Sequence, residues 1–590
     1  MRSKKTFGIF GLLAMFGLAI YGLRRKILAR LLGLQPARNP IQLYKDLKVH
    51  LPDGVTLAAD LYTPRDKRLY PTILIRTPYG RSGEISPDGL VPAFAARRFA
   101  ERGYNVIVQD VRGRFDSGGS FEPFVHEAED GRATLEWIEK QPWFNGLLGL
   151  WGPSYLGYVQ WALAPGAPLY LKAMLPVISG SALPLFAIRD GAFSAETILR
   201  WIHDLESLQP TRRPMPWLSL RLLVNKEQDR RVARAARRLP LSQADLEVSG
   251  QPQEFYRQWL AHPSRDDPYW RKQDRSSQVR SVTAAVHLVS GWYDILLRES
   301  LDDFAALRSA GRWPYLTIGP WGHQDPECYF ESLRQAITWF DAYLKTVRRA
   351  LREKPVRIFV MGKGEWRDLE IWPPPHQPIQ FFLHGPAKQE FARTRHRSPG
   401  LLLTFPAEGE SPPDAYQYDP RHPTPSLGGA LMSTHAGSRD NRRLEARPDV
   451  LTYTTAVLQN DLEIIGTPRL ALYVRSDLPH TDFFGRLCDV HPDGRSMNVC
   501  DGLLRLQPGS GTPQPDGSLR IELVLWPTAF CFQRGHAIRL QVSSGAHPRW
   551  NRNLGSGEPL TSAQTMLVAH QQVFHDQQHP SVLTLPVTRM

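Results

Sequence analysis

The stretch LGLWGPSYLGYVQW, residues 148–161, decides the fold that the sequence predicts. A short apolar run leads into Gly-Pro and Ser154, and a run with helical spacing follows. A strand, a tight turn of small residues around a serine, and a helix are the setting of a nucleophile elbow. Its consensus, G-x-S-x-G, is not matched fully, because Leu156 takes the second glycine position and Gly157 comes one residue later. An ordinary serine that caps a helix gives a similar pattern, so the stretch alone leaves both interpretations open.

Two further residues favour the nucleophile, because they supply an acid and a base in the order that an elbow requires. HLVSGWYD places Asp294 just past an apolar strand, and YLTIGPWGH places His323 just past the next one. Serine is a poor nucleophile unless a histidine takes its proton and a carboxylate holds the imidazole. The rival acids and bases are less well placed, within helices, inside a strand or too early in the chain: Asp302, Asp303, His126, His203 and His287.

The segments before Ser154 alternate between strand and helix patterns. A hairpin pattern is followed by a short apolar strand, a helix closed by Gly103, a second buried strand and an amphipathic helix, at residues 44–64, 71–80, 94–104, 105–113 and 127–141. Strands that alternate with helices indicate a mostly parallel sheet. Later in the chain, helical Arg- and Trp-rich segments predominate from about 180 to 280, and strands separated by turns predominate after about 355.

These patterns predict an α/β fold: an α/β-hydrolase core with a helical cap insertion, followed by an all-β jelly-roll domain. A chain of 590 residues is too long for one core, which supports several domains. The expected boundaries are an N-terminal segment, the first part of the core, the cap, the second part of the core and the β-sandwich, at 1–30, 44–180, 181–280, 281–350 and 355–590.

Composition is that of a globular protein, with 42% hydrophobic and 22% charged residues. The formal net charge of +14 is scattered, apart from the basic run at 225–238, which is typical of a solvated helical face. No nucleic-acid motif accompanies it, so no nucleic-acid partner is expected. The four cysteines form no CxxC pair, and Cys488 with His491 lacks a second ligand pair, so neither a disulfide framework nor a metal site is predicted.

The N-terminus carries an uncharged run at residues 7–23 with basic residues on both sides. Seventeen residues is near the lower limit for crossing a bilayer core of about 30 Å. Basic residues, rather than a small-residue cleavage site, follow the run, which favours a single-pass membrane anchor over a cleaved signal peptide. The orientation stays open, and secretion or a periplasmic location after cleavage is the alternative.

Five ordered motifs resemble those of the CocE/NonD hydrolases, which include cocaine-esterase-like enzymes, α-amino-acid ester hydrolases and X-Pro dipeptidyl-peptidases. They are RTPYG, VQDVRGR, WGPSYLG, GWYD and GPWGH, and the likeness runs from about residue 45 to the C-terminus. The resemblance implies that the Tyr79 hydroxyl and the Tyr155 backbone N–H stabilise the oxyanion. Independently, Tyr79 ends a strand in the region where elbow hydrolases keep an oxyanion donor. A turn tyrosine is the alternative for Tyr79.

Together the residues predict a serine hydrolase that cleaves a small-molecule ester or amide through Ser154, His323 and Asp294, with no cofactor. The alternatives are an X-Pro dipeptidyl-peptidase and a membrane-tethered binding protein with a vestigial triad. Members that act on amines need carboxylates near the acyl carbon, yet apolar residues, 295–297, follow the catalytic aspartate here. Esters without an α-amino group are therefore expected to be preferred, unless one of several nearby acids turns inward: Asp190, Glu196, Asp204 or Glu299. The sequence leaves the oligomeric state open.

Overall fold

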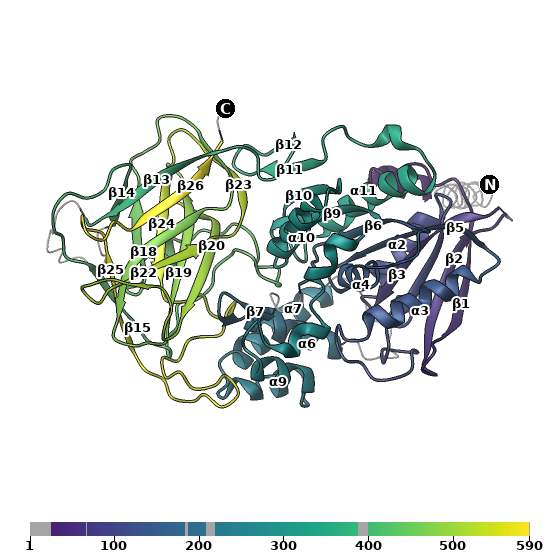
Figure 1. The fold of residues 1–590 in the computed structure, drawn as a ribbon, viewed down its shortest axis with the longest axis horizontal. Coiled ribbons are helices and arrows are strands. Elements are labelled where there is room, and N and C mark those ends of the chain that lie inside the picture. The colour runs from purple at the N-terminus through teal and green to yellow at the C-terminus, as the bar shows by residue number, and fades with distance from the viewer. Residues whose placement is uncertain (1–24, 67, 183–186, 208–218, 387–398, 589–590) are drawn as a thin grey trace, which may run out of the picture.

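The computed structural model describes residues 25–66, 68–182, 187–207, 219–386 and 399–588. Two large sheets lie side by side, and a group of helices lies between them at one side (Figure 1). The anchor predicted for residues 7–23 lies outside the described residues. Among the helices that are described, none is both long and apolar enough to cross a membrane.

The first sheet has ten strands in the order β1-β2-β4-β3-β5-β6-β9-β10-β11-β12. Neighbours from β4 to β11 pair in parallel, and the outer strands β1, β2 and β12 pair antiparallel to their neighbours. Their bounds are β1 Ile41–His50, β2 Thr56–Pro64, β3 Tyr70–Thr77, β4 Asn105–Asp110, β5 Phe144–Pro153, β6 Leu171–Val177, β9 Ala285–Tyr293, β10 Tyr315–Gly322, β11 Val356–Val360 and β12 Glu365–Leu369.

The central strands are buried along nearly their whole length, as the continuous apolar runs in the sequence predict. Helices pack against this sheet: α2 Leu90–Ala100, α3 Glu127–Glu139, α4 Tyr155–Leu163, α10 Leu297–Ser309 and α11 Pro326–Leu344. On α11, the Phe340 ring packs against Phe99 and Tyr104, at centroid distances of 5.8 and 6.3 Å. The alternation of strands and helices thus forms the α/β core that the sequence predicts.

The predicted site residues follow strands that run in the same direction. Ser154 comes directly after β5, Asp294 directly after β9 and His323 directly after β10, while Tyr79 lies two residues past β3. Because the carboxyl ends of parallel strands meet at one edge of a sheet, this topology gathers the four residues there. The sheet therefore positions the site before any side-chain contact is considered.

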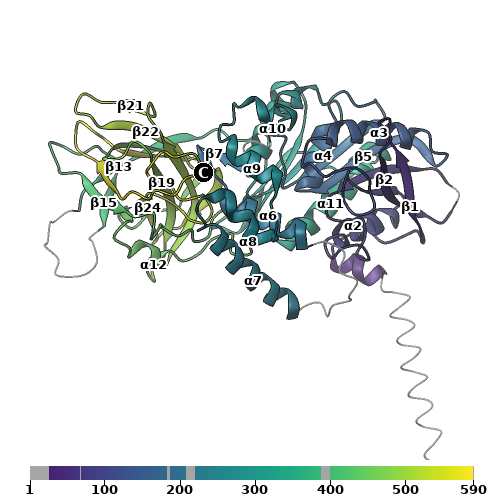
Figure 2. The ribbon, with the colours of Figure 1, turned by 90° about the horizontal axis from the view of Figure 1, so that it is seen from below.

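A largely helical segment is inserted between β6 and β9. Its described residues form two two-residue strands, four α-helices and three short 3-10 helices: β7 Ile188–Arg189, β8 Ala192–Phe193, α6 Ala195–Ser207, α7 Ser219–Ala235, η1 Leu241–Gln243, α8 Ala244–Ser249, α9 Glu254–Ala261, η2 Pro268–Lys272 and η3 Ser276–Ser281. Seen from below, α6 and α8 lie between the two sheets (Figure 2). The segment also contacts the C-terminal part, since the Glu196 backbone N–H donates to the Pro548 carbonyl over 2.9 Å.

The second sheet has fourteen strands, β13 to β26, and forms an all-β C-terminal region. The bounds are β13 Gln377–His384, β14 Gly400–Leu403, β15 Asp414–Tyr418, β16 Leu451–Thr454, β17 Leu462–Gly466, β18 Arg469–Ser476, β19 Thr481–Val490, β20 Ser496–Leu506, β21 Thr512–Pro513, β22 Leu519–Val524, β23 Thr528–Phe532, β24 Ala537–Ser543, β25 Ala569–Phe574 and β26 Val582–Val587. A single short helix, α12 Arg442–Glu445, interrupts the strands in the described part of this region.

Two boundaries differ from the predicted ones. The β-sandwich was expected from residue 355, but β11 and β12 extend the first sheet, with Leu316 of β10 opposite Val356. The sequence of an apolar strand does not show which sheet the strand will pair with. The core also begins before Tyr44, because Ala29 is buried and the Leu32 carbonyl accepts a hydrogen bond from Arg334.

Candidate active site

The turn at Ser154 separates the two interpretations that the sequence left open. Ser154 has φ of 55° and ψ of −121°, a left-handed conformation that non-glycine residues rarely adopt. Its side chain makes no hydrogen bond that caps α4. A capping serine has extended backbone and accepts from the first helical turn. The Ser154 side chain is therefore directed away from the helix, as in a strained strand-to-helix turn.

Two glycines allow this turn to form. A Cβ added at Gly152 would lie 2.3 Å from Cβ of Leu156, and one added at Gly157 would lie 2.4 Å from Cβ of Ser179. These distances are far below any normal contact. Gly157 therefore gives α4 its close approach to the segment after β6, which explains a glycine one position beyond the consensus.

The three residues predicted as a triad form one chain of hydrogen bonds. His323 Nε2 lies 3.0 Å from Ser154 Oγ, and His323 Nδ1 lies 2.6 Å from Asp294 Oδ2. The second carboxylate oxygen of Asp294 accepts the Leu296 backbone N–H over 2.7 Å. Asp294 and His323 are buried, at 0% and 3% exposure, so the contact between them is shielded from water.

The rival acids and bases are engaged elsewhere. Asp303 accepts hydrogen bonds from Ser181, and burial raises the pKa of its carboxyl well above the usual range. Asp302 lies on the exposed face of α10. His287 Nε2 lies 2.9 Å from the Thr317 hydroxyl, and burial lowers its pKa well below the usual range. The two remaining histidines each have a carboxylate 3.9 Å away: His126 lies near Glu122, and His203 lies near Asp204.

Tyr79 lies beside the serine turn, with its ring 6.5 Å from that of Tyr155 in an edge-to-face arrangement. The indole N–H of Trp201 donates to the Tyr79 hydroxyl oxygen over 2.9 Å. Burial raises the pKa of Tyr79 far above its usual value of about 10, so the phenol stays protonated at neutral pH. Tyr155 is the first residue of α4, where backbone N–H groups have no acceptor within the helix.

The side chain of Tyr155 fixes the start of α4. Its hydroxyl donates to Glu127 Oε1 over 2.7 Å and accepts the Phe124 backbone N–H over 3.0 Å. Burial raises the pKa of Glu127, and Arg76 Nη1, 2.8 Å from Oε2, opposes this shift. Tyr155 is thus tied to α3 through Glu127 and, through Arg76, to β3.

A pocket of about 450 Å³, including its opening to solvent, lies at the serine, between the sheet, the inserted helices and the C-terminal region. Its lining combines the site residues with apolar and aromatic side chains: Tyr79, Phe124, Ser154, Tyr155, Tyr158, Ser179, Gly180, Ala182, Trp201, Ile295, Leu296, His323 and Met432. No aspartate or glutamate is present among these lining residues. The pocket therefore suits an apolar or aromatic group.

The acids that the sequence offered as a clamp for an amine have other partners. Glu299 pairs with Arg189 at 2.9 Å and Asp190 with Arg298 at 2.7 Å. Glu196 pairs with Arg200 at 2.8 Å, and Asp204 accepts from Gln228. None of the four lines the pocket at Ser154. The described residues thus offer no unpaired carboxylate for an ammonium group there.

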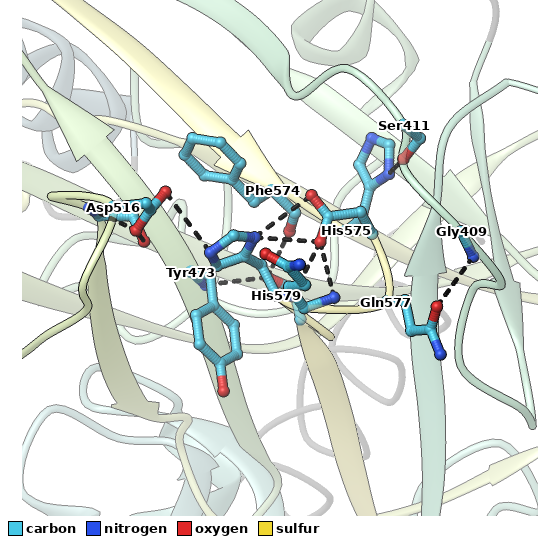
Figure 3. Close-up of polar contacts among 12 residues, drawn as sticks. Gly409, Ser411, Tyr473, Asp516, Phe574, His575, Gln577 and His579 are labelled. Carbon is cyan, nitrogen blue, oxygen red and sulfur yellow. Dashed lines mark hydrogen bonds and ion pairs between the residues drawn. The ribbon is translucent and has the colours of Figure 1, made fainter.

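A second serine–histidine contact lies in the C-terminal region. Ser411 Oγ is 3.1 Å from His575 Nδ1, and His575 Nε2 is 3.3 Å from Asp414 Oδ2. Figure 3 shows this contact beside those of His579 with Asp516 and Gln577 with Gly409. Ser411 lies in the loop before β15 and opens no helix, so it lacks the turn that exposes a nucleophile. The contacts join the β25–β26 turn to neighbouring loops.

One group in the described part of the chain has the ligand types of a metal site. Side-chain atoms of Asp489, His491 and His536 lie within 4.8 Å of one another. His536 Nδ1 is 2.9 Å from both Asp489 oxygens, so the three residues already satisfy one another. The group lies at the ends of β19 and β24, outside the pocket at Ser154.

Several pocket residues were not predicted from the sequence, and three of them come from segments away from the predicted motifs. Trp201 comes from the inserted helix α6, Phe124 from the segment before α3, and Met432 from the C-terminal region. Each looks like an ordinary apolar residue in its own segment. The high tryptophan content of residues 180–280 was the sole sequence signal, and it does not single out Trp201.

Comparison with protein families matches most of the chain. Residues 53–325 match the family described as X-Pro dipeptidyl-peptidase (S15 family). Residues 349–584 match the X-Pro dipeptidyl-peptidase C-terminal non-catalytic domain. The first match contains Ser154, Asp294 and His323, and the second contains most of the C-terminal sheet.

Individual relatives agree with these matches. A cocaine esterase of a Rhodococcus species is 32% identical over 578 residues, covering 92% of this chain and 98% of that protein. The fold is shared with an α-amino acid ester hydrolase, at a TM-score of 0.76, 22% identity and coverage of 93% of this chain and 97% of that one. An aminopeptidase from a thaumarchaeote of marine sediment shares the fold at a TM-score of 0.75 and 21% identity, with coverage of 93% of this chain and 96% of that one.

We expect Gly157→Ala to reduce the ester kcat/KM by at least tenfold or to prevent folding, because its Cβ would collide with Ser179 and displace the serine turn. Gly118→Ala is the matched control, since a Cβ there meets nothing closer than 3.5 Å. Hydrolysis of a chromogenic ester and a thermal melt would be measured for both variants. Equal activity and Tm in the two variants would contradict this account of Gly157.

Proposed function

This chain belongs to the X-Pro dipeptidyl-peptidase (S15) family of serine hydrolases, and on that premise we propose that it cleaves carboxylic esters through Ser154, His323 and Asp294. The observation that carries the proposal is the unbroken contact from Asp294 through His323 to Ser154 Oγ, at 2.6 and 3.0 Å. The strained turn at Ser154 supports it, because a merely structural serine has no need of φ near +55°.

In the first step Ser154 Oγ attacks the ester carbonyl carbon while His323 Nε2 accepts the hydroxyl proton. Asp294 holds the Nδ1–H tautomer of the ring and stabilises the imidazolium that forms. His323 then gives the proton to the departing alcohol, which leaves an acyl group on Ser154. Water, deprotonated by the same nitrogen, hydrolyses the acyl-enzyme and restores the serine.

The oxyanion that forms during attack is held by the Tyr79 hydroxyl and the Tyr155 backbone N–H. A phenol has one proton to donate, and the Trp201 N–H occupies the acceptor side of the Tyr79 oxygen. The Tyr79 proton is therefore left for a substrate oxygen. The Tyr155 hydroxyl, bonded to Glu127, keeps the start of α4 in place. Donors that are fixed in advance stabilise the developing charge without reorganisation.

The pocket favours esters whose acyl or alcohol group is apolar or aromatic. Ile295, Leu296 and Met432 supply apolar surface, and Phe124 and Trp201 supply stacked rings 5.5 Å apart. An ammonium group next to the acyl carbon would be desolvated there without a carboxylate to pair with, which costs several kcal/mol. Esters that lack an α-amino group are therefore the expected substrates.

The second candidate is an X-Pro dipeptidyl-peptidase, which the description of the matched family favours. Its substrates begin with a free amine, and the paired state of Glu299, Asp190, Glu196 and Asp204 argues against it. A binding protein with a vestigial triad is the least supported, because all three members of the triad are present and in contact. A tether through residues 7–23 stays a prediction.

Ser154→Ala should abolish ester turnover and covalent labelling by a fluorophosphonate probe, because the probe reacts with an activated serine. Ser411→Ala is the matched control, since Ser411 also contacts a histidine but should leave both readouts unchanged. Labelling would be followed by mass spectrometry of the intact chain. Full labelling of the Ser154 variant would falsify the proposed nucleophile.

Tyr79→Phe should lower kcat by about 10²–10³-fold, roughly 2.7–4 kcal/mol, as for loss of one oxyanion donor. KM should change less, because the hydrogen bond strengthens as charge develops. Steady-state kinetics would be compared with Tyr473→Phe, a phenol in β18 of the C-terminal sheet. A loss below about threefold would mean that Tyr79 is no more than a turn residue.

Three substrates test the acyl preference: an ester without an α-amino group, the matched α-amino ester, and an Xaa-Pro amide. We expect the first to have the highest kcat/KM. Leu296→Glu introduces a carboxylate into the pocket lining and should raise the α-amino ester relative to the uncharged one. A wild-type preference for the Xaa-Pro amide would instead support the peptidase.

A further inference from the structure

A second pocket lies next to the first, where the inserted segment, the loop after Asp294 and the C-terminal region meet. It has a volume of about 270 Å³, including its opening, and we call it the seam pocket. Its lining includes Arg189, Ser194, Thr197, Ile295, Trp526 and Arg549. Ile295 lines both pockets, so the seam pocket lies directly beside the space at Ser154.

Guanidinium groups surround the indole of Trp526 in this pocket. The guanidinium carbon of Arg189 lies 4.8 Å from the ring centroid, and that of Arg549 lies 4.9 Å from it. Arg298, at the edge of the group, is 5.8 Å away and pairs with Asp190. Like charges thus gather around one aromatic ring, which attracts cations but does not neutralise them.

Within the two ion-pair networks that include the lining arginines, cations outnumber carboxylates by one. Three buried guanidiniums, of Arg189, Arg486 and Arg549, contact two buried carboxylates, of Glu299 and Asp501. Asp501 is shared, with Oδ1 2.5 Å from Arg549 Nη1 and Oδ2 2.9 Å from Arg486 Nη2. A buried charge without full compensation is costly, so an anion in the pocket would be favoured.

Two N–H donors in the lining also lack an acceptor. Within the described residues, Arg549 Nη2 and Trp526 Nε1 are buried without any hydrogen-bond partner, and each of these residues is 4% exposed. Arginine and tryptophan side chains donate hydrogen bonds and accept none. A group that fits them must therefore be an acceptor. Water would satisfy the donors, but it would leave the excess positive charge in place.

The seam pocket is also linked to the catalytic loop. Arg189 Nη2 donates to the Ile295 carbonyl over 2.8 Å, and Ile295 directly follows Asp294. Thr197, in the seam pocket, stands one helical turn before Trp201, which bonds to Tyr79. A ligand bound to the arginines would thus lie next to the acyl or alcohol group of an ester at Ser154.

We propose that the seam pocket binds a carboxylate, which Arg549 Nη2 and Trp526 Nε1 recognise as an acceptor and which balances the excess buried cation. The carboxylate is either part of the substrate, remote from the scissile carbonyl, or a free small acid. The first case rests on the proposed esterase function and specifies its substrates as esters that carry a distal carboxylate.

Matched ester pairs test the substrate-borne case. The 4-nitrophenyl monoesters of adipic and suberic acid would be compared with their methyl-capped counterparts, and 3-acetoxybenzoate with its methyl ester. The carboxylate member of at least one pair should have a kcat/KM about tenfold higher or more, as for one charge-assisted hydrogen bond. Arg549→Lys should bring this ratio within about threefold, whereas Arg447→Lys, outside the pocket, should leave it unchanged.

The free acid is tested by thermal melts in sodium acetate against sodium chloride of equal ionic strength. A saturable rise in Tm specific to acetate, without any ester preference, supports a free carboxylate. Trp526→Phe, which removes the Nε1–H donor, should weaken whichever effect is seen, which covers the case in which Arg549→Lys does not fold. The absence of both effects in the wild-type protein would overturn the proposal. If neither member of any ester pair is hydrolysed, the esterase proposal fails, while the acetate melts still test the pocket.

Discussion

The strained backbone at Ser154 is the constraint on which the rest of the site depends. A non-glycine residue at positive φ costs of order 1–3 kcal/mol and persists when its surroundings hold it there. Here β5 fixes one side through its parallel neighbours, and the Tyr155 hydroxyl fixes the other through Glu127. Gly152 and Gly157 remove the two Cβ atoms that would block the turn. The result is a serine Oγ that points at His323 and not into its own helix.

Burial then gives the polar groups around this turn their strength. Asp294, His323 and Glu127 are all less than 5% exposed, and each is hydrogen-bonded. A buried charge that loses its partner destabilises a protein strongly, so such a chain tolerates few alternative arrangements. The same rule applies at the seam between the domains, where Arg549 and Asp501 are buried together but the charges do not balance. An excess of buried positive charge at this place would be stabilised by a bound anion.

The inserted segment and the C-terminal region both line the pocket, although neither supplies Ser154, Asp294 or His323. Trp201 reaches from α6 to the Tyr79 hydroxyl, and Met432 closes the pocket from the C-terminal side. A further contact joins the two segments, since the Met432 backbone N–H donates to Glu196 of α6 over 3.1 Å. The shape of the pocket therefore depends on segments that lie outside the α/β core.

The sequence by itself determined the α/β core, the all-β C-terminal region and the residues that meet at Ser154, because elbows and strand ends are local patterns. Gly-Pro-Ser after a strand, Asp294 after another and His323 after the next need no knowledge of long-range packing. Only the tertiary structure decided that Val356 joins the first sheet, that Trp201 orients Tyr79, and that Arg189 and Arg549 share one indole. Those contacts join residues up to several hundred positions apart. Their geometry depends on how separate segments pack against one another, and the residue type at one position does not predict which distant residue it will contact.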